Sequence, residues 1–421
     1  MIEQSTVIQE KALLVGVVTH KSSQININIY LDELEFLAKT AGAKVLGRIT
    51  QKISKKNPTT LIGTGKARSL INQAEELGAD LIIFDDELTP AQIKNYHKMS
   101  NKLKIMDRSG IILDIFQKHA KTKEATTQVD LAYFEYLLPR LTRQWTHLER
   151  QMGGIGTRAG MGETQIEIDR RLIRQRITRL KKELITIEKA RTTKSLNRKS
   201  EFRVALVGYT NAGKSTLFNA LTGSNVLIRN QLFATLDTTV RQLKIDASHK
   251  ILISDTVGFI RKLPHNLVAS FKSTLQEVLE ADLIIIVLDM SSKQLSDNLD
   301  TINGVLKDMR ADNIPVIHVL NKVDLISNLD IINRLQSSFP DSITISAQHH
   351  LMLLELKEKI VNQMEKNYQT IELEFSYEDG KVIANAQKGV EVLERVYDDD
   401  GVKLKIRGTR PRINQILSWS H

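Results

Sequence analysis

One glycine-rich segment limits the fold of this chain more than any other feature. An apolar stretch, 203–207, runs directly into it, and a helix-forming stretch, 216–221, follows it. A strand, a G-x-x-x-x-G-K-S loop and a helix in this order form the phosphate-binding site of P-loop proteins. The segment reads Gly208-Tyr209-Thr210-Asn211-Ala212-Gly213-Lys214-Ser215. The sequence therefore predicts an α/β domain that binds a nucleoside triphosphate.

The residues of this loop have separate expected roles. The backbone amides of the loop and of the helix N-terminus bind phosphate oxygens. We expect Lys214 to contact the β- and γ-phosphates as a catalytic residue, and Ser215 to ligate Mg²⁺.

A later motif predicts which base is bound. Asn321-Lys322-Val323-Asp324 follows the apolar stretch 316–320. One carboxylate can accept from both N1–H and N2–H₂ of guanine, a donor pair that adenine lacks, and a carboxylate left unpaired is costly. We therefore expect GTP and GDP as ligands. Asp324 would select guanine, Asn321 would tie this segment to the phosphate loop, and the Lys322 stem would cover the base.

A further segment completes the expected guanine site. Ser346-Ala347-Gln348 follows the strand-like stretch 343–345, and its backbone can contact the guanine oxygen.

Asp255-Thr256-Val257-Gly258 directly follows the apolar stretch 251–254. A carboxylate at a strand end can hold the Mg²⁺ shell, and the Gly258 amide can contact the γ-phosphate as a catalytic group. Phe259 follows, where many GTPases have a glutamine that orients the attacking water. We therefore expect slow GTP hydrolysis by the isolated chain and stimulation by a partner.

A switch loop lies between these motifs. It needs one threonine that ligates Mg²⁺ and senses the γ-phosphate. The segment reads Phe233-Ala234-Thr235-Leu236-Asp237-Thr238-Thr239. Spacing alone does not choose among its three threonines.

Length and composition bound the class of protein. A chain of 421 residues predicts two to four domains. The absence of cysteine excludes a disulfide-stapled secreted protein and a cysteine-ligated metal site. The first residues lack the shape of a signal peptide, and the longest apolar run, near 283–288, is too short for a membrane span. We therefore expect a cytoplasmic protein.

The distribution of patterns predicts four parts. Residues 1–120 alternate strands and helices, which favours a mostly parallel sheet. Residues 121–199 show two apolar seams at helical spacing around the glycine-rich stretch 153–162, which predicts an antiparallel helical hairpin and a linker. Pro139 conflicts with the first helix and should kink it or mark its start. The Ras-like P-loop G domain is expected over 200–365, and a small C-terminal α+β domain over 366–421.

The net charge of +10 is concentrated in one segment, because residues 121–200 hold 18 Lys/Arg against 9 Asp/Glu. A local excess of this kind is typical of a polyanion-binding surface. The alternative interpretation is a solvated basic helix face.

Motifs outside the nucleotide segments resemble the HflX family of GTPases. They are Asp107–Phe116, Gln128–Leu141, the loop Gly153–Arg158 with Gly162-Glu163-Thr164-Gln165, and Phe233–Asp237 followed by Asp255–Phe259. The resemblance implies a GTPase that binds the large ribosomal subunit and its RNA and splits stressed ribosomes. It also favours Thr235 as the catalytic, Mg²⁺-ligating threonine. We expect a monomer without DNA specificity. The run Ala159-Gly160-Met161-Gly162 departs from the family pattern, which leaves the geometry of the loop open.

Two other functions stay open at this point. Gly63-Thr64-Gly65-Lys66 stands before a helix, and it could bind phosphate in an ATP-dependent RNA-remodelling factor with a regulatory G domain. The alternative for this motif is a turn and a helix start. Phe259 also allows a non-enzymatic RNA-binding module that only senses GTP.

Overall fold

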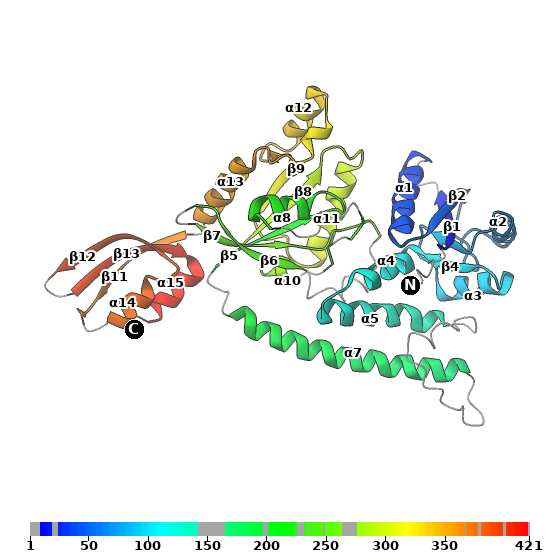
Figure 1. Cartoon of the computed structure of the whole chain (residues 1–421), viewed down its shortest axis with the longest axis horizontal. Coiled ribbons are helices and arrows are strands. Elements are labelled where there is room, and N and C mark those ends of the chain that lie inside the picture. Colours follow the sequence, from blue (N-terminus) through cyan, green and yellow to red (C-terminus); the bar gives the residue numbers. More distant parts are fainter. Residues whose placement is uncertain are drawn as a thin grey trace, which may run out of the picture. The chain divides into compact units, whose positions relative to one another are not determined.

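The structure is a computed structural model, and its chain forms two compact units (Figure 1). Unit 1 holds residues 1–187, 230–236 and 262–272, and unit 2 holds the rest. The residues described are 9–18, 24–141, 165–196, 201–224, 231–233, 235–236, 238–246, 249–262, 276–366, 368–377, 380–398 and 401–419. No helix among these residues is long and apolar enough to cross a membrane.

Unit 1 begins with a parallel four-stranded sheet of order β2-β1-β3-β4. Strand β3 reads LIIF and is buried along its whole length, as expected for a strand covered on both faces. The strands are β1 (Lys11–Val18), β2 (Lys44–Lys52), β3 (Leu81–Phe84) and β4 (Lys104–Asp107). The helices are α1 (Gln24–Thr40), α2 (Thr64–Glu76), α3 (Pro90–Met99) and α4 (Arg108–His119). The predicted parallel α/β domain is confirmed.

Two antiparallel helices follow, α5 (Lys123–Leu137) and α7 (Gln165–Leu196). Thr122 caps α5 by accepting from the amide of Ala125. Leu137 of α5 and Ile173 of α7 are buried together with Leu141 in one apolar cluster. The ion pairs Lys123–Glu183, Arg176–Asp130 and Lys181–Glu135 connect their polar edges.

Pro139 does not kink α5, because it follows the end of that helix, and the alternative that it marks a helix start concerns residues outside the described ranges. Helix α5 starts at Lys123 and ends at Leu137, and Pro139 lies in the 3-10 turn η1 (Leu138–Arg140) that follows. Proline has no N–H to continue the helical ladder but fits the first residues of a short turn. The expected glycine-rich tip at 153–162, with Arg158, lies outside the described residues.

Unit 2 contains a six-stranded sheet of order β10-β9-β8-β5-β7-β6, in which only β6 is antiparallel to its neighbour. Its strands are β5 (Phe202–Gly208), β6 (Thr239–Lys244), β7 (Lys250–Asp255), β8 (Leu283–Asp289), β9 (Val316–Asn321) and β10 (Ile343–Thr344). The other elements are α8 (Lys214–Thr222), α10 (Gln276–Leu279), α11 (Leu295–Asp308), η2 (Val323–Leu325), α12 (Leu329–Ser338) and α13 (Leu353–Lys366).

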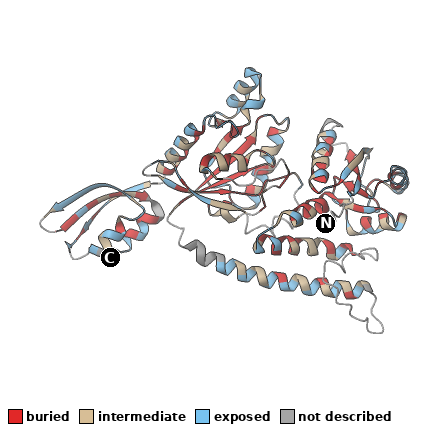
Figure 2. Cartoon of the chain, in the orientation of Figure 1, coloured by how far each residue is buried: buried red, intermediate tan, exposed pale blue. Residues whose placement is uncertain are grey.

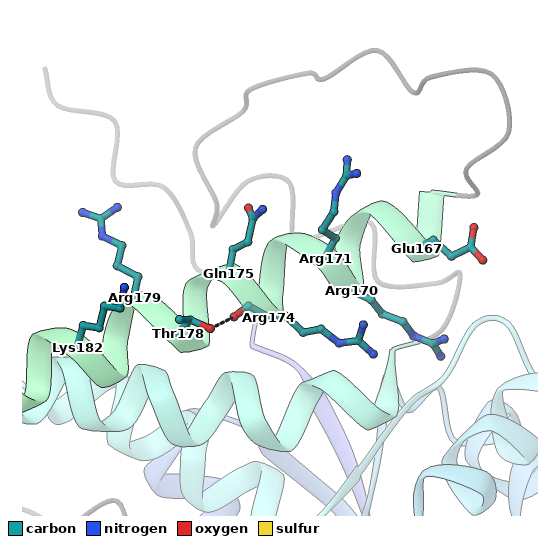
Figure 3. A pocket seen from close by; sticks show the side chains of 8 residues that line it. All are labelled: Glu167, Arg170, Arg171, Arg174, Gln175, Thr178, Arg179 and Lys182. Atoms are coloured by element: carbon teal, nitrogen blue, oxygen red, sulfur yellow. Dashed lines mark hydrogen bonds between the residues drawn. The ribbon is translucent and has the colours of Figure 1, made fainter.

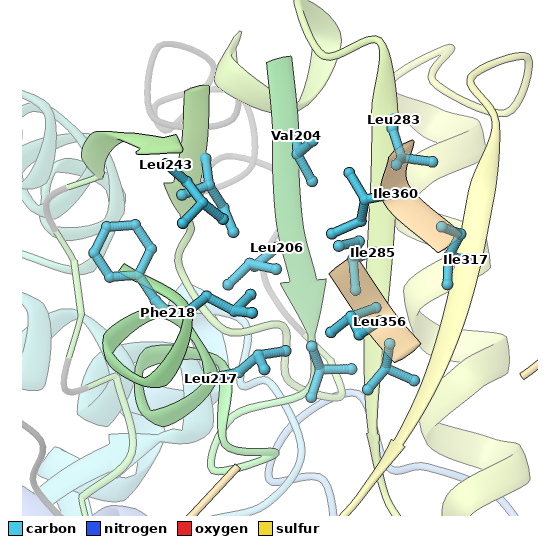
Figure 4. Packing of buried hydrophobic residues seen from close by; sticks show 14 of the residues in the cluster. Val204, Leu206, Leu217, Phe218, Leu243, Leu283, Ile285, Ile317, Leu356 and Ile360 are labelled. Carbon is cyan, nitrogen blue, oxygen red and sulfur yellow. The ribbon is translucent and has the colours of Figure 1, made fainter. Parts of the chain in front are cut away.

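The core of this sheet lies where strands meet helices. Val204, Leu206 and Ile285 of the central strands point toward Phe218 of α8 and Ile360 of α13 (Figure 4). Figure 2 shows that the central strands are largely buried, whereas α12 is mostly exposed. This packing fixes the start of α8, and therefore the phosphate loop, against the carboxyl end of β5.

The last part of unit 2 is a small α+β domain. Strands β11 (Tyr368–Phe375), β13 (Gly401–Thr409) and β12 (Glu391–Asp398) form an antiparallel sheet in that spatial order. Helices α14 (Gly380–Ala386) and α15 (Arg410–Leu417) contribute Ala386 and Ile413 to its core. The predicted fold class is confirmed, whereas the domain boundaries at 120, 199 and 365 remain predictions.

Candidate nucleotide-binding site

The phosphate loop needs glycine at two positions for different reasons. A Cβ on Gly208 would collide with the carbonyl oxygen of Val287 on the neighbouring strand. Gly213 has φ +94°, and a Cβ there would collide with Nδ2 of Asn321. The loop can therefore approach both β8 and the guanine motif only because these side chains are absent.

Lys214, the first residue of α8, is buried with 6% of its surface exposed. Its Nζ donates to the carbonyl oxygens of Gly208 at 3.1 Å and Tyr209 at 2.9 Å. Burial lowers the pKa of this amine to about 8, and the nearby Asp255 carboxylate opposes that shift. The amine thus lies inside the loop that would surround a phosphate group.

Ser215 at the start of α8 lies beside Asp255 at the end of β7. The Ser215 hydroxyl donates to Asp255 Oδ2 at 2.6 Å, and Asp255 is fully buried at the end of β7. A hydroxyl beside a carboxylate is the oxygen donor set that Mg²⁺ takes in P-loop enzymes, so these residues fit the ion. Ser215 would hold the ion, and Asp255 would hold its water shell. Bound Mg²⁺ would neutralise charge on the β- and γ-phosphates.

The segment after β7 lies against the phosphate loop. Phe259 pairs with Tyr209 as a parallel bridge, its amide donates to Gly208 O at 3.0 Å, and its carbonyl accepts from Thr210 N at 2.8 Å. A Cβ on Gly258 would lie 2.8 Å from Thr210 Cγ2 and 3.0 Å from Lys214 Nζ, so only glycine fits. Thr256 anchors the segment by donating to Leu206 O at 2.6 Å, and Val257 beside it is buried.

Asn321 joins three of the predicted segments. Its Nδ2 donates to Ala212 O at 2.9 Å, and its Oδ1 accepts from the amide of Ala347 at 3.0 Å. Asn321 and Ala347 are each 2% exposed. The phosphate loop, the N-K-x-D motif and the Ser346–Gln348 segment therefore form one rigid frame in unit 2.

Asp324 lies in η2 beside this frame, and Val323 N donates to Ile345 O at 3.3 Å. Asp324 Oδ2 is 3.8 Å from His349 Nε2, and its side chain is 18% exposed. Ser346 is fully buried and Gln348 is exposed. Lys322 adopts φ +66° and pairs with Asp289 Oδ2 at 2.7 Å.

The predicted switch segment is divided between the two units, with residues 233–236 in unit 1 and residues 237–239 in unit 2. Phe233 has φ +56° and is 2% exposed, and its ring meets Phe116 of α4 edge to face with centroids 4.5 Å apart. Leu236 is also buried, and Thr235 is half-buried. Ala234 and Asp237 lie outside the described residues. Ser215 belongs to unit 2, so the pair Ser215 and Thr235 as Mg²⁺ ligands stays a prediction.

Sequence reasoning missed three interactions, including the pair of Lys322 with Asp289. The Tyr209 hydroxyl accepts from the amide of Arg261 at 2.8 Å. Lys262 Nζ lies 2.9 Å from Asp85 Oδ2 within unit 1. Only Asp289 had a usable signal, since a carboxylate ending a parallel strand lies at the ligand-binding edge of the sheet.

The polyanion surface predicted from the sequence would include the basic side chains of α7. This helix holds ten Lys/Arg against four Asp/Glu. Figure 3 shows cationic side chains extending from several successive turns around one hollow. Its basic members are Arg170, Arg171, Arg174, Arg179 and Lys182, all exposed. A row of exposed cations at this spacing can contact successive phosphates of a nucleic acid.

In the second candidate phosphate-binding motif, Gly63–Lys66, the lysine side chain donates a hydrogen bond to the protein backbone. Gly63 has φ +90° directly before α2, and Lys66 Nζ donates to Lys52 O at 2.8 Å at the end of β2. This contact supports the interpretation of Gly63–Lys66 as a turn and a helix start.

Family models match almost the whole length of the chain between residues 28 and 322. Residues 28–117 match "GTP-binding GTPase N-terminal", residues 119–198 match "GTP-binding GTPase Middle Region", and residues 203–322 match "50S ribosome-binding GTPase".

Relatives named GTPase HflX align over most of the chain. The relative from Flavobacterium psychrophilum is 49% identical over 86% of this chain and 86% of its own length. The relative from Caldanaerobacter subterraneus subsp. tengcongensis is 42% identical over 95% and 91%. The relative from Escherichia coli (strain K12) is 39% identical over 90% and 89%.

Proposed function

The chain belongs to the HflX family and is a GTP-hydrolysing enzyme, and from that premise we propose that it acts on ribosomes through the large subunit. In this proposal the GTP-bound protein binds ribosomal RNA and splits or rescues stalled ribosomes. Hydrolysis then releases it. A protein with this role works in the cytoplasm.

The basic face of α7 carries the proposal. Five exposed cations that line one hollow all belong to α7. This helix is held against α5 by an apolar contact and three ion pairs. The residues of α7 that form these three ion pairs are not among the five cations that line the hollow. RNA binding to phosphates through Lys and Arg accounts for such a surface. The description of the matching family model, "50S ribosome-binding GTPase", supports the large subunit as the source of that RNA.

The nucleotide site would act as follows. Asp324 selects guanine, while Asn321 fixes the frame that holds the base and the phosphate loop. Lys214 and the Gly258 amide contact the γ-phosphate, and Ser215 and Thr235 hold Mg²⁺. The remaining proposed contacts are backbone contacts from Gly208–Ser215, Phe233–Asp237, Asp255–Gly258, Asn321–Asp324 and Ser346–Gln348.

Water activation is the incomplete part of this site. Phe259 is 1% exposed and packs against the phosphate loop, and its side chain has no group that could orient water. A ribosomal partner that supplies or orders such a group would raise turnover. This is the physical basis for proposing ribosome-stimulated hydrolysis.

The test is sedimentation of the full chain with purified large subunits in a non-hydrolysable GTP analogue. Arg170→Glu, Arg174→Glu and Arg179→Glu in one variant should weaken binding at least tenfold. The slope of log affinity against log salt should also become shallower by about one unit for each phosphate that no longer has a cationic partner.

The matched control reverses three exposed cations elsewhere in unit 1, Arg68→Glu, Lys94→Glu and Lys102→Glu. It should keep most of the affinity. Equal weakening by both variants would show only a net-charge effect, and unchanged binding by the α7 variant would remove the proposed surface.

A further inference from the structure

Among the described residues of unit 2, three recorded hydrogen bonds join the phosphate loop to the segment that follows Gly258. Two of these are backbone hydrogen bonds, Phe259 N to Gly208 O and Thr210 N to Phe259 O. The third uses a side chain, because the Tyr209 hydroxyl accepts from the amide of Arg261 at 2.8 Å. A side-chain substitution leaves the two backbone hydrogen bonds in place. The hydrogen bond of the Tyr209 hydroxyl, in contrast, is lost when this side chain is changed.

The junction controls where Gly258 lies relative to Lys214. Gly258 is packed so closely that an added Cβ would lie 3.0 Å from Lys214 Nζ. Thr256 fixes the front of the segment through Leu206 O, and the Tyr209–Arg261 bond fixes its end. Between these anchors Phe259 and Ile260 are each 1% exposed. The backbone from 256 to 261 is therefore held at both ends.

We propose that Tyr209 is a positioning residue for GTP hydrolysis, which holds the segment 256–261 on the phosphate loop through the Arg261 amide. A buried phenylalanine follows Gly258, so no side chain at that position can order the attacking water. Catalysis then depends on how firmly the backbone of this segment is placed, because positioning and preorganised dipoles account for most of the rate of phosphoryl transfer. The inference rests on the GTPase activity and not on ribosome binding.

The distinction between GTP and GDP gives the test its specificity. The γ-phosphate contact of Gly258 belongs to GTP alone, whereas the loop amides and Asp324 serve both nucleotides. Removing the hydroxyl while keeping the ring should therefore change turnover and leave GDP affinity intact. Loss of general loop structure would instead weaken both.

The experiment compares full-length wild type, Tyr209→Phe and the control Tyr377→Phe, whose hydroxyl donates to Asp398 O in the C-terminal domain. Single-turnover GTP hydrolysis without ribosomes should fall about five- to tenfold in Tyr209→Phe, as expected for the removal of one hydrogen bond. The dissociation constant for GDP should stay within about twofold. Tyr377→Phe should match wild type in both measurements.

Hydrogen exchange gives an independent check of the same bond. The Arg261 amide should exchange about tenfold faster in Tyr209→Phe, with exchange in β5 and β8 unchanged. Turnover equal to or higher than wild type would overturn the proposal, as would equal losses of GTP turnover and GDP affinity. A result of either kind would leave the ribosome proposal untouched.

Discussion

Lys262 Nζ lies 2.9 Å from Asp85 Oδ2, although 177 positions separate the two residues. The other oxygen of the same carboxylate accepts from Arg108 Nη1 at 2.8 Å. The two cations differ sharply in exposure, because the Lys262 side chain is 39% exposed and that of Arg108 is 1% exposed. The energies of a buried and a partly exposed ion pair can therefore be compared at the same carboxylate, that of Asp85.

We predict that Arg108→Met destabilises the N-terminal sheet by about 3–5 kcal/mol, because Asp85 and Glu33 both lose a buried partner. Lys262→Met should cost less than about 1 kcal/mol, since solvent already screens that pair. Native-state hydrogen exchange of β1 and β3 in the full chain measures both. Similar losses for the two variants would contradict the assigned difference in burial.

The lowered pKa of Lys214 leads us to predict that nucleotide binding depends on pH. Burial lowers the pKa of its amine to about 8, so the free enzyme loses this proton as the pH rises through that value. Phosphate groups favour the charged amine, and binding should take up close to one proton between pH 8 and the ordinary lysine value of 10.5.

Affinity for GDP should accordingly fall by up to about tenfold per pH unit above pH 8. Calorimetry in buffers of different ionisation enthalpy checks the proton uptake directly. An affinity and a proton balance that stay flat from pH 7 to pH 10 would exclude this role for the lysine.

We propose that the choice of base depends on Asp324. In Asp324→Asn the amide nitrogen faces the guanine donors, and we predict at least about a hundredfold loss of GTP affinity. Xanthine offers an oxygen where guanine has its amino group, so XTP should bind the variant more tightly than GTP does. Competition with labelled GDP measures the order. The His349→Ala control should retain guanine preference, and Asp324→Asn that still prefers GTP would refute the assignment.

Ser215→Ala tests the proposed metal site. The hydroxyl that faces Asp255 is removed without a change in core volume, because Ser215 is only half-buried. Wild type should bind a GTP analogue at least about tenfold more tightly with Mg²⁺ than with a chelator, and the variant should lose most of that difference. A variant that keeps the full Mg²⁺ effect would place the ion elsewhere.

Local patterns predicted the elements that carry four of the nucleotide motifs, because Gly208–Ser215, Asp255–Gly258, Asn321–Asp324 and Ser346–Gln348 each come at or after the end of an apolar strand. The strand order places these strand ends at one edge of the sheet. Periodicity could not show where α5 ends, since the apolar seam continues past Pro139 while the helix stops at Leu137. The edge strands β11 and β12 have mixed patterns because most of their residues are exposed.

Interactions between distant segments were also beyond the sequence. Nothing in spacing links Tyr209 with Arg261, or Lys262 with Asp85, because such pairs depend on how two loops meet after folding. The absence of a water-orienting glutamine, in contrast, could be predicted, because Phe259 stands in its place directly after Gly258 in the sequence. The sequence could therefore indicate an incomplete catalytic set but not what holds that segment in place.

Phosphate release from GTP, measured for the purified chain alone, with large subunits and with small subunits, tests the central claim most directly. The account predicts about 10⁻² s⁻¹ or less for the chain alone and at least tenfold stimulation by large subunits. Turnover near 1 s⁻¹ without ribosomes, or no stimulation by large subunits, would contradict it.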